Sequence, residues 1–155
     1  MAKVGTSQFQ GYLIGQVIGA AVGALLLVVD DFAGFYYRSG YVDVWGYITL
    51  YPISLATILI LLGIGGLLQA LYAAIQSLQA KDEASPTFLK ENARKTMLGA
   101  GFTAALAGVG AIIFIISAII NDYGDWWFGA GFYGAFIGGL LAALFGKMMY
   151  DQIES

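Results

Sequence analysis

The sequence contains no cysteine and no histidine among its 155 residues. Disulfides, iron–sulfur clusters and cysteine-rich zinc sites are therefore excluded, together with the commonest protein ligands of haem and copper. Charged residues are also scarce, at 11% of the chain, and the net charge is −3. A nucleic-acid-binding surface needs a broad basic footprint. We therefore expect no nucleic-acid partner, no cofactor and no bound metal.

Apolar residues are abundant, at 59% of the chain, and several apolar runs exceed the roughly 18 residues that mark a membrane-spanning helix. We predict four spans, at about 9–29, 52–78, 96–120 and 128–149. They would form two helical hairpins within a single transmembrane domain, residues 1–155. The predicted fold class is all-α, an integral membrane four-helix bundle. We also expect the first apolar segment to be retained rather than cleaved as a signal peptide.

Two prolines mark helix starts. Ser85 and Pro86 form a good N-terminus, with serine as the N-cap and proline in the first turn, so the third helix should run from Pro86 to about Ile120. Pro52 similarly marks the start of the second helix. Because the third span begins only near residue 96, residues 79–95 should form a cytoplasmic helical extension that projects past the headgroups.

The distribution of basic residues predicts the orientation of the bundle. One side carries Lys3, Lys81, Lys90, Arg94, Lys95 and Lys147, whereas the other has Arg38 as its basic residue. Both termini should therefore be cytoplasmic, in a multi-pass protein of a cell membrane or a virion membrane. The tryptophans would then lie at the outer interface, where such rings are enriched.

This layout of four spans with a tryptophan-bearing first outer loop resembles that of claudin-like tetraspan proteins. The first loop of that family carries a cysteine pair near the tryptophan, and this chain has no cysteine. The resemblance is one of layout, and it implies no function for this chain.

Small residues recur at every fourth position in the first span, as Gly11, Gly15, Gly19 and Gly23. Glycine inside a helix costs about 0.8–1.0 kcal/mol relative to alanine, so a regular series indicates close backbone approach between membrane helices. The fourth span carries one row with Gly134, Gly138, Ala142 and Gly146, and a second row beside it with Gly131, Ala135, Gly139 and Ala143. These rows either pack within one bundle or face another subunit. Two adjacent rows favour the second alternative.

Uncharged polar residues are the only hydrophilic groups in the span interiors, and they are Gln16, Ser54, Thr57, Gln69, Thr103 and Ser117. The lack of ionisable groups there disfavours proton- or sodium-coupled transport. For Gln16, which lies within the glycine series, we predict an interhelical polar contact. A pore or ligand contact is the alternative.

Aromatic residues dominate the predicted outer loops, as Phe35, Tyr36, Tyr37, Tyr41, Trp45, Trp126 and Trp127. Such a loop either folds onto the bundle top or is buried against a neighbour, and the enrichment of Tyr and Trp in interfaces favours a neighbour. The acidic residues on this side match no calcium-loop pattern, and no nucleophile or phosphate cradle accompanies them. We therefore predict no enzymatic activity.

These features together predict a structural or accessory building block of an oligomeric membrane assembly. The assembly could be a homo-oligomer, a virion or organelle shell, or a multi-subunit membrane complex, packed through Gly/Ala stripes of the glycine-zipper kind. The expected partners are the lipid bilayer and either further copies of the chain or other membrane subunits. The alternative function is a small oligomeric channel or permeation protein.

Overall fold

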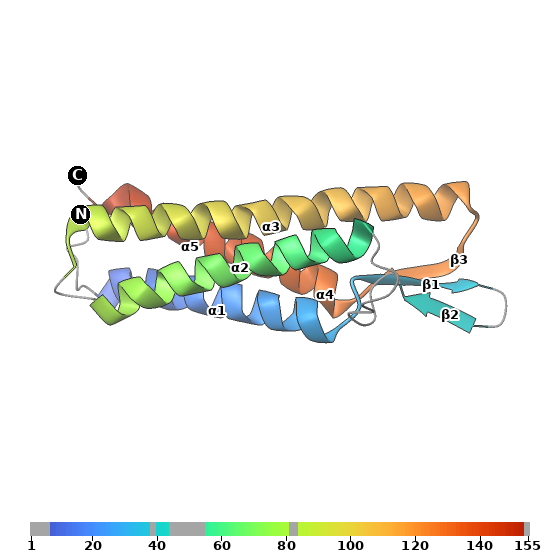
Figure 1. The fold of residues 1–155 in the computed structure, drawn as a ribbon, viewed down its shortest axis with the longest axis horizontal. Helices are drawn as coiled ribbons and strands as arrows, with labels where there is room; N and C mark the ends of the chain where they lie inside the picture. Colours follow the sequence, from blue (N-terminus) through green and yellow to red (C-terminus); the bar gives the residue numbers. More distant parts are fainter. Residues whose placement is uncertain (1–6, 38–39, 44–54, 81–83, 154–155) are drawn as a thin grey trace.

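The computed structural model describes residues 7–37, 40–43, 55–80 and 84–153. Its helices run along one long axis (Figure 1), as α1 Ser7–Val29, α2 Leu55–Ala80, α3 Pro86–Ile120, and a fourth helix composed of α4 Ala130–Tyr133, η2 Gly134–Gly138 and α5 Gly139–Gln152. All four are long and apolar enough to cross a membrane. The helical bundle expected from the sequence is therefore present. The cytoplasmic location of the termini stays a prediction, although α1 begins and α5 ends at the same end of the bundle.

An antiparallel sheet at the other end of the bundle corrects the all-α prediction. Its strand order is β2-β1-β3, with β1 Ala33–Tyr37, β2 Gly40–Asp43 and β3 Gly124–Phe128. Phe35 of β1 lies opposite Val42 on one side and Trp126 on the other. Aromatic residues favour strands. Because the two outer connections meet at one end, their backbone donors and acceptors can pair with each other.

The third helix begins and ends as the sequence predicts. The Ser85 hydroxyl accepts a hydrogen bond from the Phe88 backbone N–H at 3.2 Å, which confirms the N-cap. At the other end, the N–H of Tyr123 donates to the Ala118 carbonyl and that of Asp122 to the Ile119 carbonyl, with Asp122 at φ 50°. This is the hydrogen-bond pattern of a Schellman motif. It stops α3 and turns the chain back into β3.

Of two other helix boundaries, one lies outside the described residues and one differs from that expected. The predicted start of the second helix at Pro52 lies outside the described residues, which resume at Leu55 within α2. The fourth helix begins at Ala130 rather than at residue 128, because Phe128 is paired with Ala33 in the sheet. It also contains a π-helical turn, η2, and continues to Gln152.

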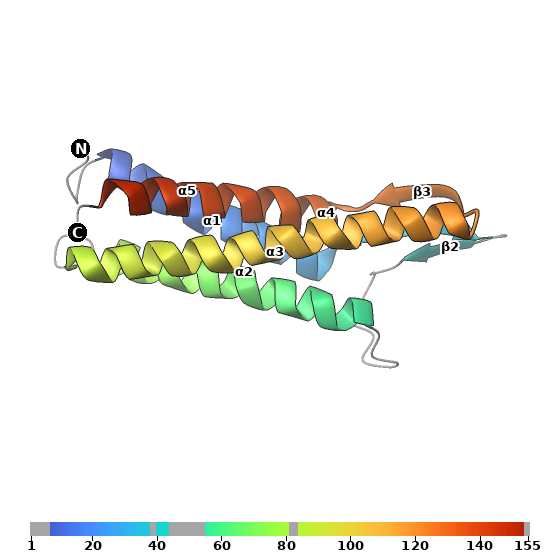
Figure 2. The ribbon, with the colours of Figure 1, turned by 90° about the horizontal axis from the view of Figure 1, so that it is seen from above.

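The helices are staggered at the sheet end, and the predicted projection of residues 79–95 past the headgroups stays a prediction. Leu89 and Ala93 of α3 belong to a buried cluster with Phe9 of α1 and Met149 of α5. The described part of segment 79–95 therefore packs beside α1 and α5. At the sheet end, α3 continues beyond α1 (Figures 1 and 2), and its Phe114 packs against Trp126 and Phe128 of β3.

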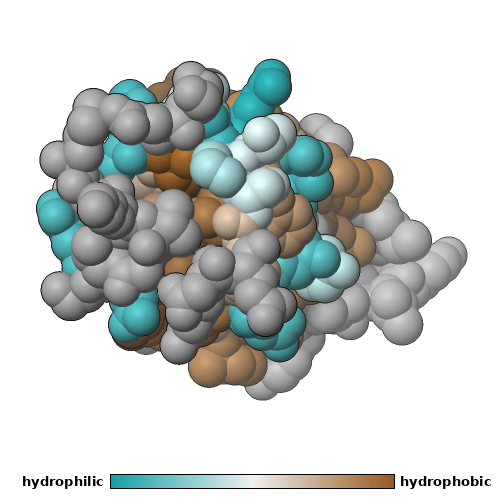
Figure 3. All heavy atoms as spheres, turned by 90° about the vertical axis from the view of Figure 1, so that its left-hand side faces the viewer, coloured by the Kyte–Doolittle hydropathy of each residue, from teal (hydrophilic) through white to brown (hydrophobic). Residues whose placement is uncertain are grey.

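Hydrophilic residues surround the apolar interior at the end opposite the sheet (Figure 3). Two ion pairs lie on the helix surfaces there, Lys95 with Glu91 at 2.7 Å and Lys147 with Asp151 at 2.6 Å. The Lys90 ammonium lies 4.9 Å from the centre of the Tyr150 ring. This end of the bundle therefore carries charged and polar groups on its surface.

Candidate functional site

The glycine series of α1 packs against the fourth helix of the same chain. A Cβ added at Gly19 would lie 2.9 Å from the Gly138 carbonyl oxygen, and one at Gly23 would lie 2.7 Å from the Gly134 carbonyl oxygen. A Cβ at Gly15 would meet the Phe145 ring at 2.5 Å. Gly11 differs, because a Cβ there would have no described neighbour within 4 Å. Three of the four glycines therefore permit close packing within the chain.

Small residues of the fourth helix face two different helices, and the division does not follow the two predicted rows, because Gly146 of the first row faces α3. On one side, Gly138 approaches the Gly19 carbonyl, Gly134 approaches the Leu26 side chain, and Ala142 is fully buried. On the other side, Gly139 approaches the Ala100 carbonyl and Gly146 approaches the Ala93 carbonyl, both on α3. The fourth helix therefore does have two close neighbours, but both of them, α1 and α3, belong to the same chain. The surplus of small residues is thus no argument for another subunit.

Gln16 lies wholly buried between α1 and α5, at 0% exposure. Its Nε2 donates to the Phe145 carbonyl oxygen at 3.5 Å and to Met149 Sδ at 3.3 Å. Its Oε1 has no hydrogen-bond partner among the described residues. The structure therefore places Gln16 at an interhelical contact within the chain.

The outer aromatic residues divide into a buried group and an exposed group. Phe35 is buried and stacks on Tyr123, with ring centres 3.8 Å apart, and Trp127 packs against Tyr36 at 5.5 Å. Tyr36 and Trp126 remain 54% and 41% exposed. Trp45 and the side chains of Tyr37 and Tyr41 lie outside the described part. The described aromatics thus fold onto the bundle end, and burial of Tyr36 and Trp126 against a neighbour stays a prediction.

A surface groove between α2 and α3 brings together glycine residues and one amide. We call it the Gln69 groove, and it is lined by Leu61, Leu62, Gly65, Gly66, Gln69, Leu98, Gly99 and Phe102. Gly66 and Gly99 form its floor, because each lies against the backbone of the other. Gly65 and Gln69, one turn apart on α2, are both exposed. The Gln69 amide makes no side-chain hydrogen bond with the rest of the described chain.

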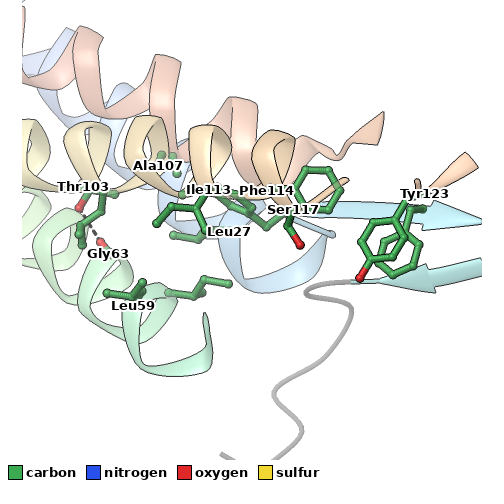
Figure 4. Close-up of a pocket in the computed structure, with 15 residues that line it drawn as sticks. Leu27, Leu59, Gly63, Thr103, Ala107, Ile113, Phe114, Ser117 and Tyr123 are labelled. Carbon is green, nitrogen blue, oxygen red and sulfur yellow. Dashed lines mark hydrogen bonds between the residues drawn. The ribbon is translucent and has the colours of Figure 1, made fainter. Parts of the chain in front are cut away.

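A cavity of about 300 Å³ lies between α1, α2, α3 and the sheet (Figure 4). We call it the α2–α3 cavity. Leu27, Leu59, Ile60, Ala107 and Phe114 are among its mostly apolar lining. Leaving a closed space of this volume empty would cost on the order of 7 kcal/mol, at about 24 cal/mol per Å³. This cavity is open to the surroundings, so hydrocarbon can fill it.

Polar groups occur at both ends of the α2–α3 cavity. At the inner end, the Thr103 hydroxyl donates to the Gly63 carbonyl at 2.7 Å, which joins α3 to α2. At the outer end lie the hydroxyl groups of Ser117 and Tyr123. Asn121 Nδ2 donates to the Ser117 carbonyl at 2.8 Å and to its hydroxyl at 3.3 Å.

Comparison with known proteins adds no relative. No protein-family model, curated protein or solved structure matches this chain. The function must therefore be inferred from the geometry itself. Within the described residues, no cluster of acidic side chains is suited to holding a metal ion.

The sequence pointed to Gln16 rather than Gln69 as the notable polar residue. The two glutamines are alike in sequence, since each lies in an apolar span that also carries glycines. They differ in rotation about their helices, because Gln16 faces α5 whereas Gln69 faces outward. The spacing of Gly65 and Gln69 could have indicated the groove, because residues four apart lie on the same face of a helix.

Proposed function

We propose that this chain is a non-enzymatic building block of a membrane assembly and that it associates with further copies of itself through the Gln69 groove. The observation that carries the proposal is the exposed amide of Gln69, near the middle of the apolar segment Thr57–Ala80. In a bilayer this surface would face hydrocarbon, where an unsatisfied amide is costly. A partner that supplies hydrogen bonds at this depth removes that cost.

A second copy is the partner that fits the chemistry of the groove. A glutamine amide carries both a donor and an acceptor, so two Gln69 side chains related by a twofold axis can satisfy each other. A Cβ at Gly65 would have no described neighbour within 4 Å, so another helix can approach the backbone closely there. Small residues and amides are the usual means of association between membrane helices.

The expected strength of the contact is modest. Interhelical polar contacts in membranes contribute about 0.6 kcal/mol on average and about 1–2 kcal/mol in model peptides. Close packing of the partner helix against Gly65 should stabilise the dimer further. Replacing Gln69 by leucine should therefore weaken association about 3- to 30-fold, since about 1.4 kcal/mol corresponds to a factor of ten.

The test is the dimer dissociation constant of the full chain in lipid vesicles, measured by single-molecule photobleaching across a dilution series. We expect Gln69→Leu and Gly65→Leu to weaken association, and Gln69→Asn to retain most of it. Gln79→Leu is the matched control, because Gln79 is exposed on the same helix but lies outside the groove. A native chain that is monomeric at every density, or a Gln69→Leu variant that associates like Gln79→Leu, would contradict the proposal.

The channel alternative has less support. It depended on Gln16 as a pore-lining residue, and the Gln16 side chain is buried against α5. We therefore give self-association precedence.

A further inference from the structure

We propose that the α2–α3 cavity binds one acyl chain of a bilayer phospholipid, taken from the leaflet on the sheet side. This inference rests on the cavity and is independent of the Gln69 groove. Three properties of the cavity support it, namely its wedge shape, the placement of its polar groups and its length.

The wedge opens beyond two contacts that hold α2 against α3, and a further contact lies farther from the sheet, where the Thr96 hydroxyl donates to the Ala70 carbonyl at 3.2 Å. Gly66 and Gly99 allow the two backbones to touch, and the Thr103 hydroxyl bonds the Gly63 carbonyl at 2.7 Å. Beyond this level α2 diverges from α3 toward the sheet end (Figure 2). Two of the α3 residues that line the resulting space, Ala107 and Gly110, are small, although Leu106, Ile113 and Phe114 line it as well. A slender apolar group fits such a wedge better than a bulky ring system.

The polarity of the lining changes along the cavity in the way that a lipid requires. The inner part is apolar, because the Thr103 hydroxyl donates its hydrogen to a backbone carbonyl. The hydroxyl groups of Ser117 and Tyr123 lie at the outer end, close to the Schellman turn of α3. An acyl chain would occupy the inner part, and the polar outer end would receive the ester linkage. Side chains that combine an apolar body with a polar tip are typical of this membrane depth.

The length and the opening of the cavity suit one leaflet. Thr103 and Ser117 are fourteen residues apart on α3, which corresponds to about 21 Å at about 1.5 Å per residue. Half of a hydrocarbon core about 30 Å thick is about 15 Å, so the cavity can accept the hydrocarbon of one chain and the start of its polar end. Ile113, which lines the cavity, is 58% exposed. The cavity is therefore accessible sideways from the lipid.

The decisive experiment is photolabelling of the full chain in phosphatidylcholine vesicles that contain a trace of phospholipid with a diazirine in the middle of one acyl chain. After irradiation, peptides are mapped by mass spectrometry. We expect several-fold more label on Leu59, Ile60 and Leu106, which line the cavity, than on Ile18 of α1, although Ile18 is the more exposed residue. Equal labelling of all these positions would show only annular lipid and would overturn the proposal.

Two variants and a control distinguish a bound chain from general lipid contact. Ala107→Phe fills the cavity from the buried side, and Ile113→Trp obstructs its opening from an exposed position. Both should abolish the excess labelling. Val109→Phe is the control, because Val109 is exposed on α3 without lining the cavity, and it should leave the labelling unchanged. Excess label that survives Ile113→Trp, or an apolar molecule other than phospholipid extracted in equimolar amount from the purified protein, would refute the inference.

Discussion

The contact between α1 and the fourth helix can be tested by adding a single methyl group at Gly138. A Cβ there would lie 2.6 Å from the Gly19 carbonyl oxygen and 3.0 Å from the Gly23 Cα. Both atoms belong to the backbone, so no side-chain rotation relieves the overlap. Since carbon–oxygen contacts of this kind are about 3.3–3.6 Å, α1 must move outward by about 0.7–1.0 Å. That movement also loosens the neighbouring contact of Gly19 with Ala142.

The magnitude follows from two opposing effects. Overpacking that displaces backbone costs about 1–3 kcal/mol, whereas alanine gains about 0.8–1.0 kcal/mol over glycine in a helix. Because the overlap at Gly138 involves only backbone, we expect the upper part of the overpacking range, and thus a net loss of about 1–2 kcal/mol for Gly138→Ala. Gly11→Ala is the matched control. Its Cβ meets no described atom within 4 Å, so that variant should gain up to about 1 kcal/mol.

The measurement is reversible unfolding of the full chain in micelles, by denaturant titration or steric trapping. The free energies of unfolding of the two variants should differ by about 2–3 kcal/mol, with the native chain between them. If Gly138→Ala proves as stable as Gly11→Ala, then α1 and the fourth helix do not pack backbone to backbone. That result would refute the arrangement described above for the glycine series.

Two further predictions concern single hydrogen bonds. Thr103→Val removes the donor to the Gly63 carbonyl without changing the side-chain shape, and it should destabilise the bundle by about 0.5–1.5 kcal/mol in the same unfolding assay. Thr103→Ser should restore most of this stability. A Thr103→Val variant as stable as the native chain would mean that the hydrogen bond is not formed. Ser85→Ala removes the acceptor for the Phe88 N–H and should lower the stability of the helix start by about 1 kcal/mol. The loss should appear as faster hydrogen exchange confined to the first turn of α3. Unchanged exchange at the Phe88 amide would contradict the N-cap.

Local signals in the sequence predicted the helices because the information is local. The length of each apolar run indicates a span, and Ser85 with Pro86 marks the start of α3 through a contact that reaches only three residues along the chain. The sheet was not predicted because its strand pairing joins residues that are far apart in the sequence. Gly34 of β1 pairs with Trp127 of β3, and a strand of five residues carries no mark of a partner so distant in sequence.

The contacts of the candidate site were likewise not predictable from local sequence patterns. The small-residue rows of the fourth helix predicted two neighbours and favoured another subunit as one of them, but composition could not reveal that α1 and α3 supply the close contacts. Likewise, the sequence contains Gln16 and Gln69 in comparable surroundings. Which glutamine is buried depends on the rotation of each helix, and rotation is set by packing across the whole bundle.

The central position of β1 in the sheet has a consequence for the timing of biosynthesis. Its neighbour β2 follows almost at once, whereas Trp127, which pairs with Gly34, is synthesised 93 residues later. At about 5–20 residues per second, β1 waits about 5–20 s for its second partner. During that interval α2 and α3 are added to α1, while one edge of β1 remains unpaired. A chain that stalls before Gly124 therefore presents an open strand edge to its neighbours, and such edges promote pairing between chains.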